Sequence, residues 1–184
     1  MHSRNTGLMK MLTAIHQIDL RLLAGIFRQG ERRAVRPLAR AISRSGDGYL
    51  HVLLPALLWL AQVEQWLTFV QLLGLALLVE RCLYWSLKNS LRRPRPQASV
   101  PGFRSLVTAA DQFSFPSGHS SAAFLLSTCV VIIWGGPLLA LYAWAAMVAL
   151  SRVLLGVHFP GDTVAGAFMG TVIALASAST LGLA

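Results

Sequence analysis

The chain has 184 residues, of which 55% are hydrophobic and only 12% are charged, and its mean hydropathy is +0.59. This composition is typical of an integral membrane protein and excludes an ordinary soluble domain. The formal net charge of +9 does not favour nucleic-acid binding by itself, since the basic residues lack interleaved aromatic residues. We therefore expect an all-α protein, a polytopic bundle of membrane helices.

Residues 8–27 carry apolar side chains at spacings of three and four, which places them on one stripe of a helix. The stripe consists of Leu8, Met11, Leu12, Ile15, Ile18, Leu22 and Ile26. Polar and charged residues, among them Asp19 and Arg21, interrupt the remaining surface and would be costly inside lipid. We predict an amphipathic helix that lies in the membrane interface or packs on the bundle, with a first, poorly hydrophobic span as the alternative.

Residues 28–46 are rich in arginine and keep apolar residues at helical spacing, so they predict a second amphipathic helix. Its arginines suit the anionic head groups of lipids, although a solvated positive face explains them equally well. A turn rich in Gly, Ser and Asp follows at residues 45–48. We accordingly divide the chain into an amphipathic, basic N-terminal region, residues 1–47, and a membrane-embedded core, residues 48–184.

Five apolar stretches follow, and each predicts one transmembrane helix. They cover residues 49–63, 66–87, 119–134, 138–155 and 163–181. The first is short of the usual requirement of about 20 residues, so its ends must draw on flanking residues. Late in the second stretch lie Glu80 and Arg81, a pair that we expect near the polar end of the helix, in contact with neighbours in the bundle.

The last stretch carries small residues at intervals of four, Gly166, Gly170 and Ala174, which places them on one helix face. Such a face allows another helix to approach closely. We expect a neighbour within the bundle to use it, and a homodimer formed through these residues is the alternative.

The connection between the second and third stretches, residues 88–118, is long and rich in Arg and Pro, and connections of this length are usually functional. Each span crosses the membrane once, so this connection and the one between the fourth and fifth stretches share one side. That side receives two histidines, one aspartate, one serine and three cations: Lys88, Arg95, Ser117, His119, Arg152, His158 and Asp162. We predict that these side chains form one site at the membrane surface.

This set of side chains suits a phosphoryl group. Three cations and the free N–H groups at the start of a helix match its negative oxygens, and Gly118 lets a ligand approach the backbone. Two histidines can supply a nucleophile and a general acid, and Asp162, four residues after His158, can hold the other ring nitrogen of that histidine. No cluster of carboxylates predicts a magnesium site, so we expect neither a metal nor another cofactor.

Each of these residues has a simpler interpretation when it is taken alone. Asp162 can cap the last helix, Arg152 can extend its head group to the interface, and His158 can be an interfacial aromatic residue. Together, these interpretations require that all of the residues meet at one end of the bundle by coincidence, so we prefer the functional interpretation.

The spacing of these residues resembles the three-part signature of the type 2 phosphatidic acid phosphatase superfamily. The three parts are Lys88-x6-Arg95-Pro96, Pro116-Ser117-Gly118-His119 and Ser151-Arg152-x5-His158-x3-Asp162. The resemblance implies a metal-independent phosphatase that works through a phosphohistidine. By motif position, His158 is the nucleophile, Asp162 orients it, and His119 protonates the leaving oxygen and then activates water. The residues that would hold the phosphate are Lys88, Arg95, Ser117, Gly118 and Arg152.

Two further features of the family apply to this chain. Its membrane members typically have six spans, whereas five apolar stretches are clear here, so the first of the six spans would have to be residues 8–27. The family also includes vanadium-dependent haloperoxidases, which hold vanadate in the same cradle. Those members are soluble, and the apolar stretches of this chain argue against that branch.

A site at the membrane surface suits a lipid phosphate, whose tail stays in the bilayer while its head group enters the site. The resemblance suggests phosphatidic acid, phosphatidylglycerol phosphate or an undecaprenyl phosphate or pyrophosphate carrier, and a multi-pass protein of the bacterial inner membrane. We expect the site on the periplasmic face, although the positive-inside rule favours the cytoplasm if residues 8–27 do not cross. The alternative function is a non-catalytic lipid-phosphate binding or transport protein.

Overall fold

The structure is a computed structural model that describes residues 2–183, with the side chains of residues 2–13 and 15 outside the description. The described residues form helices joined by turns and one long loop, and the only β-type pairing among them is an isolated bridge between Pro94 and Phe113. This confirms the expected all-α class. The helices are α1 (His2–Gly30), α2 (Val35–Ser45), α3 (Leu50–Leu60), α4 (Trp66–Leu91), α5 (Pro96–Ser99), α6 (Gly118–Trp134), the 3-10 helix η1 (Gly136–Ala140), α7 (Leu141–Leu154) and α8 (Pro160–Thr180).

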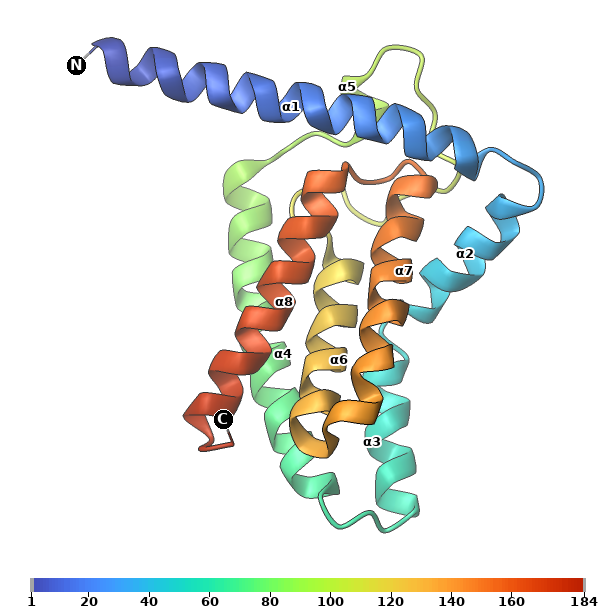
Figure 1. The fold of residues 1–184 in the computed structure, drawn as a ribbon, viewed down its shortest axis with the longest axis vertical. Helices are drawn as coiled ribbons and strands as arrows, with labels where there is room; N and C mark the ends of the chain where they lie inside the picture. The colour runs from blue at the N-terminus through green and yellow to red at the C-terminus, as the bar shows by residue number, and fades with distance from the viewer. Residues whose placement is uncertain (1, 184) are drawn as a thin grey trace.

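The five apolar stretches form a bundle of helices that run side by side (Figure 1). Three segments are long and apolar enough to cross a membrane: α4, the continuous run of η1 and α7, and α8. The other two, α3 and α6, are shorter apolar helices. With 11 residues, α3 is about 16 Å long, well below the hydrocarbon thickness of roughly 30 Å. These helices make the chain a multi-pass membrane protein.

Helix α6 lies at the centre of the bundle, among α4, α7 and α8 (Figure 1). A Cβ atom on Gly170 would lie 2.1 Å from the carbonyl oxygen of Ser121, and one on Gly166 would lie 2.4 Å from that of Ser117. Glycine at these positions therefore lets α8 approach the backbone of α6. Gly166, Gly170 and Ala174 are all buried within one chain, as expected for packing inside the bundle, and the alternative of a homodimer finds no support in this face.

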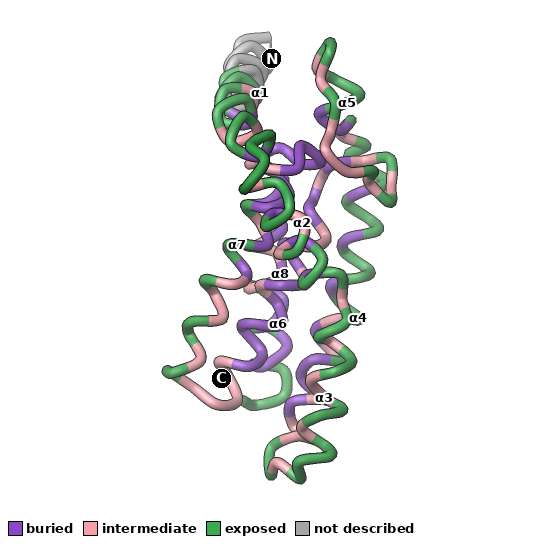
Figure 2. Tube along the Cα trace, turned by 90° about the vertical axis from the view of Figure 1, so that its right-hand side faces the viewer, coloured by how far each residue is buried: buried purple, intermediate pink, exposed green. Residues whose placement is uncertain are grey.

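Helix α1 crosses over one end of the bundle instead of running along it (Figure 1, Figure 2). Among its described side chains Asp19 and Leu23 are buried, whereas Ile18 and Leu22 of the predicted apolar stripe are 55% and 49% exposed. The helix forms where the spacing predicts it, but of the described stripe residues only Ile26 packs on the protein, against the cluster that includes Leu23. The packed face includes Asp19, whose carboxylate accepts hydrogen bonds from Arg93 and from the N–H of Gly161. Leu8, Met11, Leu12 and Ile15 of the stripe lie outside the described side chains.

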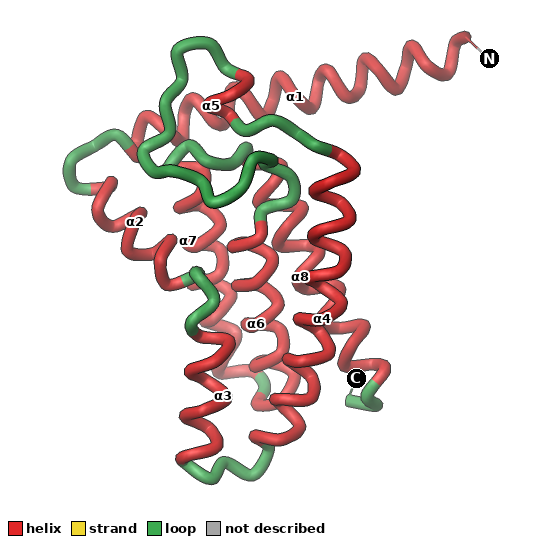
Figure 3. The backbone as a smooth tube through the Cα atoms, turned by 180° about the vertical axis from the view of Figure 1, so that it is seen from behind, coloured by secondary structure: helices red, strands yellow, loops and turns green. Residues whose placement is uncertain are grey.

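The end of the bundle under α1 also receives α2 and the long loop formed by residues 92–117 (Figure 3). Within this loop only the short helix α5 is regular. Helix α4 continues to Leu91, beyond the predicted end at residue 87, so Lys88 lies in its last turn. The motif residues thus reach one end of the bundle from the last turns of α4 and α7, the starts of α6 and α8, and the loops.

Replacing Gly170 with alanine should lower the melting temperature of the protein in detergent, because the new Cβ would press on the Ser121 carbonyl and separate α8 from α6. Overpacking of this kind costs about 1–3 kcal/mol. Gly74→Ala is the matched control, since no atom lies within 4 Å of a Cβ at that position of α4, and alanine there should keep or raise the melting temperature. Equal melting temperatures for the two variants would contradict the close contact between α6 and α8.

Candidate active site

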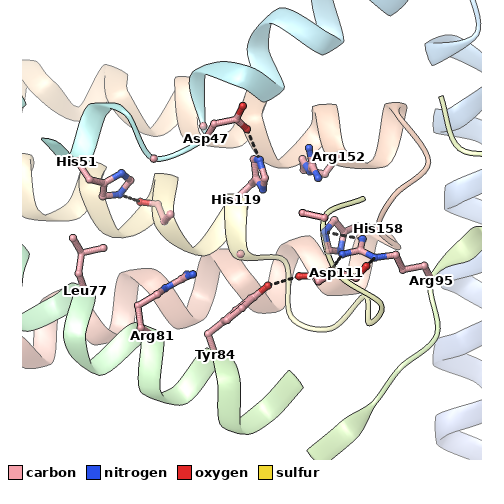
Figure 4. Close-up of a pocket in the computed structure, with 15 residues that line it drawn as sticks. Asp47, His51, Leu77, Arg81, Tyr84, Arg95, Asp111, His119, Arg152 and His158 are labelled. Carbon is pink, nitrogen blue, oxygen red and sulfur yellow. Dashed lines mark hydrogen bonds and ion pairs between the residues drawn. The ribbon is translucent and has the colours of Figure 1, made fainter. Parts of the chain in front are cut away.

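A cavity of about 490 Å³ opens at the polar end of the bundle, between α3, α4, α6 and α7. Five of the predicted site residues line it: Arg95, Gly118, His119, Arg152 and His158. Figure 4 shows His119, Arg152 and His158 turned towards one space from three different segments. The other three predicted residues, Lys88, Ser117 and Asp162, are buried behind the cavity wall.

His158 lies in the short segment between α7 and α8 and is 2% exposed. Its Nδ1 atom lies 3.6 Å from Asp162 Oδ2, and its Nε2 atom lies 3.3 Å from Arg95 Nη1. Burial lowers the pKa of His158 to about 4, an effect that the Asp162 carboxylate opposes and the Arg95 charge strengthens. The imidazole is therefore neutral near pH 7. With Nδ1 protonated towards Asp162, the Nε2 lone pair accepts from Arg95 Nη1 in the cavity wall.

Asp162 is fixed by two further contacts besides the one with His158. Its Oδ2 accepts a hydrogen bond from the Phe159 N–H at 2.9 Å, and its Oδ1 accepts one from Arg93 Nη1 at 2.7 Å. The bond from Phe159 caps α8, so the same carboxylate both begins the helix and faces the histidine. These two bonds keep the fully buried carboxylate next to Nδ1 of His158.

Arg93 connects this carboxylate to α1. Its Nη2 atom donates to Asp19 Oδ2 at 2.7 Å, while the other oxygen of Asp19 accepts the N–H of Gly161 at 2.7 Å. Helix α1 thus supports the first turn of α8, in which Asp162 lies. Neither Asp19 nor Arg93 is part of the predicted site, and the ion pair joins residues 74 positions apart, so no local spacing in the sequence reveals it.

Asp111, on the long loop, joins two of the predicted cations. Its Oδ2 accepts hydrogen bonds from Lys88 Nζ at 2.6 Å and from the Tyr84 hydroxyl at 2.8 Å, and its Oδ1 is bonded to Arg95 Nη2. Burial would raise the pKa of Asp111, but the hydrogen bonds from Lys88, Arg95 and Tyr84 hold it well below the usual range. Lys88 and Arg95 therefore converge on one ionised group, as the binding of an anion requires.

Sequence reasoning did not place Asp111 or Tyr84 in the site. One signal for Asp111 was available, because it is the only acidic residue in the connection 88–118 and buried cations need an anionic partner. Tyr84 precedes Lys88 by one helical turn, and its ring centroid lies 4.4 Å from Lys88 Nζ. An aromatic residue at this spacing is common in membrane helices, so the sequence contained no specific signal for it.

Arg152, in the last turn of α7, has no carboxylate partner among the described residues. Its Nη1 atom donates to Ser43 Oγ at 2.5 Å. Its Nε atom is buried and has no hydrogen-bond partner in the described part of the chain. A buried donor without a partner is costly, so Arg152 is well placed to bind an anion that enters the cavity.

The Pro-Ser-Gly turn begins α6. Ser117 is the N-cap residue, and its Oγ accepts hydrogen bonds from the N–H of Ser120 at 3.5 Å and from the hydroxyl of Ser120 at 3.0 Å. A Cβ on Gly118 would lie 3.0 Å from the Tyr84 ring, so glycine keeps the cavity open at this point. Ser117 thus serves the helix cap, and its contact with a phosphate stays a prediction.

His119 has a partner that sequence reasoning did not identify. Its Nε2 atom lies 2.7 Å from Oδ1 of Asp47, in the turn between α2 and α3. We predicted this turn from its composition and assigned it to the N-terminal region, but Asp47 lines the cavity. A carboxylate at this distance fixes the orientation of the imidazole ring.

The charge that faces the cavity is supplied by side chains rather than by a preformed metal cage. Within the residues that the structure describes, no three His, Cys, Asp or Glu side chains are grouped so that they could hold a metal ion. An anion in the cavity would instead meet Arg95, Arg152 and the first turn of α6. This arrangement suits a phosphoryl group, whose oxygens carry negative charge throughout its transfer.

Comparison with known proteins identifies the family. Residues 69–182 match the model of the PAP2 superfamily. Over 123 residues the chain is 34% identical to the "Putative undecaprenyl-diphosphatase YbjG" of Escherichia coli (strain K12), a match that covers 65% of this chain. The match spans only 61% of the length of that relative.

Two solved structures are similar to this one. The crystal structure of Aquifex aeolicus LpxE has a TM-score of 0.73 and 26% identity, and the match covers 87% of this chain and 94% of the other. The first transmembrane PAP2-type phosphatidylglycerolphosphate phosphatase from Bacillus subtilis shares the fold, with a TM-score of 0.73 and 22% identity over 92% of this chain and 87% of the other. With its family model matched over four of the five apolar helices, α4, α6, α7 and α8, the chain belongs to the PAP2 superfamily.

Proposed function

We propose that this protein hydrolyses a phosphomonoester or a diphosphate carried by a membrane lipid, through a phosphohistidine and without a metal ion. The strongest support is the geometry of the buried His158 imidazole, whose Nδ1 atom lies 3.6 Å from Asp162 Oδ2 and whose Nε2 atom lies 3.3 Å from Arg95 Nη1 in the cavity wall. A neutral imidazole nitrogen next to a phosphate-binding cation is suited to nucleophilic attack on phosphorus. Membership of the PAP2 superfamily supports the same class of reaction.

In the first step, His158 Nε2 attacks the phosphorus atom, and the bond from phosphorus to the leaving oxygen breaks. His119 donates a proton to that oxygen as it leaves. Asp162, 3.6 Å from Nδ1 of His158, stabilises the positive charge that the imidazole gains. The phosphoryl oxygens contact Arg95, Gly118 and Arg152 in the cavity wall. We assign Lys88 and Ser117, which are buried beside this wall, to the same phosphate-binding set.

In the second step, a water molecule attacks the phosphorus atom of the phosphohistidine. His119, which has lost its proton, accepts one from the water, and the bond from phosphorus to Nε2 breaks and returns its electron pair to the nitrogen. Orthophosphate is released and both histidines return to their starting states. Asp111 must share Lys88 and Arg95 with the phosphate during this cycle, since its carboxylate contacts both cations.

A lipid is the substrate class that fits the position of the cavity. The cavity lies at the polar end of apolar helices, so a head group can enter it while the tail stays in the bilayer. Phosphatidic acid, phosphatidylglycerol phosphate and an undecaprenyl phosphate or pyrophosphate carrier all meet this requirement. The similarity to a protein named as an undecaprenyl-diphosphatase supports the last of these.

We propose that five helices cross the bacterial inner membrane, α3 together with the turns that flank it, and that α1 lies in the interface. The exposed side chains of Ile18 and Leu22 support this position of α1, because they suit the boundary between head groups and acyl chains. We assign the cavity to the periplasmic face. Arg93, Arg95 and Arg152 are bound within the site, so they are weak guides under the positive-inside rule.

We propose that a single chain is the catalytic unit. Residues 48–184 form the catalytic core, and residues 1–47 add the contacts of Asp19 and Asp47 at its polar end. The face of Gly166 and Gly170 is occupied by α6, so no second copy is needed to complete the bundle there.

The purified protein in detergent with EDTA should release orthophosphate from a lipid phosphate or diphosphate. His158→Ala and His119→Ala should each lose at least about 99% of this activity, because they remove the nucleophile and the general acid. Arg28→Gln, which replaces an exposed arginine of α1, is the control and should keep full activity. A colorimetric assay of orthophosphate measures all four proteins.

Undiminished turnover in both histidine variants would contradict this mechanism. A wild type that binds lipid phosphate but releases no orthophosphate from any of the proposed lipids would favour the non-catalytic binding or transport function. Melting temperatures close to that of the wild type would show that the two variants are folded.

The assignment to the periplasmic face is tested by labelling in intact cells. In a chain with Cys82 and Cys129 replaced by alanine, Ala98→Cys on the exposed part of the loop should react with a membrane-impermeant maleimide. Glu64→Cys, in the turn at the other end of the bundle, should react only after the membrane is permeabilised. The reverse pattern would place the cavity on the cytoplasmic face.

A further inference from the structure

The cavity does not end at His119. It continues between α3 and α4, where His51, Leu77 and Arg81 line it. Figure 4 shows the order along the cavity, with His158 at one end, His119 in between, and Arg81 and His51 beyond it. None of the residues beyond His119 belongs to the three motifs, and the proposed mechanism does not use them.

Arg81 is the unusual member of this part of the cavity. It lies ten residues before the end of α4 at Leu91, almost three helical turns, in a helix long and apolar enough to cross a membrane. A guanidinium group at this depth is costly and is kept in such helices chiefly for function. We expected Arg81 only to contact its neighbours in the bundle, but its side chain is 45% exposed and lines the cavity.

Glu80 and Tyr84 hold the guanidinium group in place. Glu80, which is fully buried, accepts hydrogen bonds from Arg81 Nε at 2.5 Å and from Nη2 at 2.6 Å. The Tyr84 ring centroid lies 4.5 Å from Arg81 Cζ. The remaining nitrogen, Nη1, has no hydrogen-bond partner among the described residues. The side chain is thus fixed with one donor edge free, which is a preformed contact for an anion.

The position of Arg81 beyond His119 indicates what this edge would contact. In the proposed reaction His119 protonates the leaving oxygen, so the space beyond His119 receives the group attached to that oxygen. In a prenyl monophosphate this group is an uncharged carbon chain, and in phosphatidic acid it is an uncharged glycerol ester, so neither offers a guanidinium an anionic partner. Phosphatidylglycerol phosphate carries a second phosphate, but a glycerol unit separates that phosphate from the leaving oxygen. In a lipid diphosphate it is a second phosphate with negative oxygens.

We propose that Arg81 forms a second phosphate subsite and makes a lipid diphosphate the preferred substrate. The terminal phosphate meets His158, the inner phosphate meets Arg81, and the tail continues past Leu77 into the bilayer. One water molecule is consumed, and the products are orthophosphate and the lipid monophosphate. Arg81 stabilises the negative charge that develops on the leaving monophosphate. This inference rests on the proposed phosphatase function and narrows its substrate class.

The test compares one prenyl chain in two forms, farnesyl diphosphate and farnesyl monophosphate, hydrolysed by the full-length protein in detergent. The readout is the ratio of the two kcat/KM values. A substitution that changes the fraction of active protein, or the binding of the terminal phosphate that both substrates share, affects both values equally and cancels in the ratio. The variant is Glu80→Gln/Arg81→Gln, since Arg81→Gln alone would leave a buried carboxylate unpaired. The matched control is Glu80→Gln, which keeps the guanidinium, and Arg28→Gln serves as a control outside the cavity.

For the wild type, kcat/KM should be about tenfold or more higher for the diphosphate than for the monophosphate, a factor that corresponds to the free energy of one charge-assisted hydrogen bond. In the double variant this ratio should fall by at least about tenfold, whereas in Glu80→Gln and Arg28→Gln it should stay close to the wild-type value. A second measurement needs no variant. Methylenediphosphonate, which resists hydrolysis, should inhibit the wild type about tenfold more strongly than orthophosphate does, because it can occupy both subsites.

An unchanged ratio in the double variant, or a wild type that does not prefer the diphosphate, would overturn the subsite and leave the phosphatase proposal intact. Equal losses on both substrates would show that the Glu80–Arg81 pair only stabilises the fold. A wild type that hydrolyses neither prenyl substrate nor any other lipid phosphate would overturn the proposed function itself, and the subsite with it.

Discussion

Buried charge is the constraint on which the polar end of this bundle depends. Lys88 and Arg95 pair with Asp111, and Arg93 joins Asp162 to Asp19 on α1. Because an unpaired charge in such surroundings is strongly destabilising, these pairs fix the long loop and α1 to the helix ends. Arg152 lacks a carboxylate partner among the described residues, and this leaves a cation for an anionic head group.

Close packing of α6 and α8 places the N-termini of these two helices beside the cavity. Gly166 and Gly170 let α8 approach the backbone of α6, and at their shared end the N–H of Ser117 donates to the Asp162 carbonyl at 3.0 Å. The N-termini of both helices therefore meet beside His158, and their dipoles add to the positive potential there. The His158 imidazole, which lines the cavity, is thus placed in a field that favours a phosphoryl group.

The sequence was sufficient for the helices and for the motif residues, but not for their partners. Apolar runs and the turn at residues 116–118 are local signals that predict the bundle helices, and counting the crossings of these helices puts His119, Arg152 and His158 at one end. The partners Asp19, Asp47 and Asp111 come from distant segments, so their contacts depend on how α1 and the loops fold over the bundle. The position of Arg81 in the cavity wall could not be predicted either, because its distance from the helix end does not show which side of the helix faces a cavity.

Covalent catalysis by His158 can be tested by trapping the phosphorylated protein. Wild type mixed with farnesyl diphosphate labelled in its terminal phosphate and quenched in alkali should carry an acid-labile, alkali-stable label. Mass spectrometry should place the phosphate on His158, and His158→Ala should remain unlabelled. Substrate turnover with no labelled protein, or a label on another residue, would contradict nucleophilic catalysis by His158.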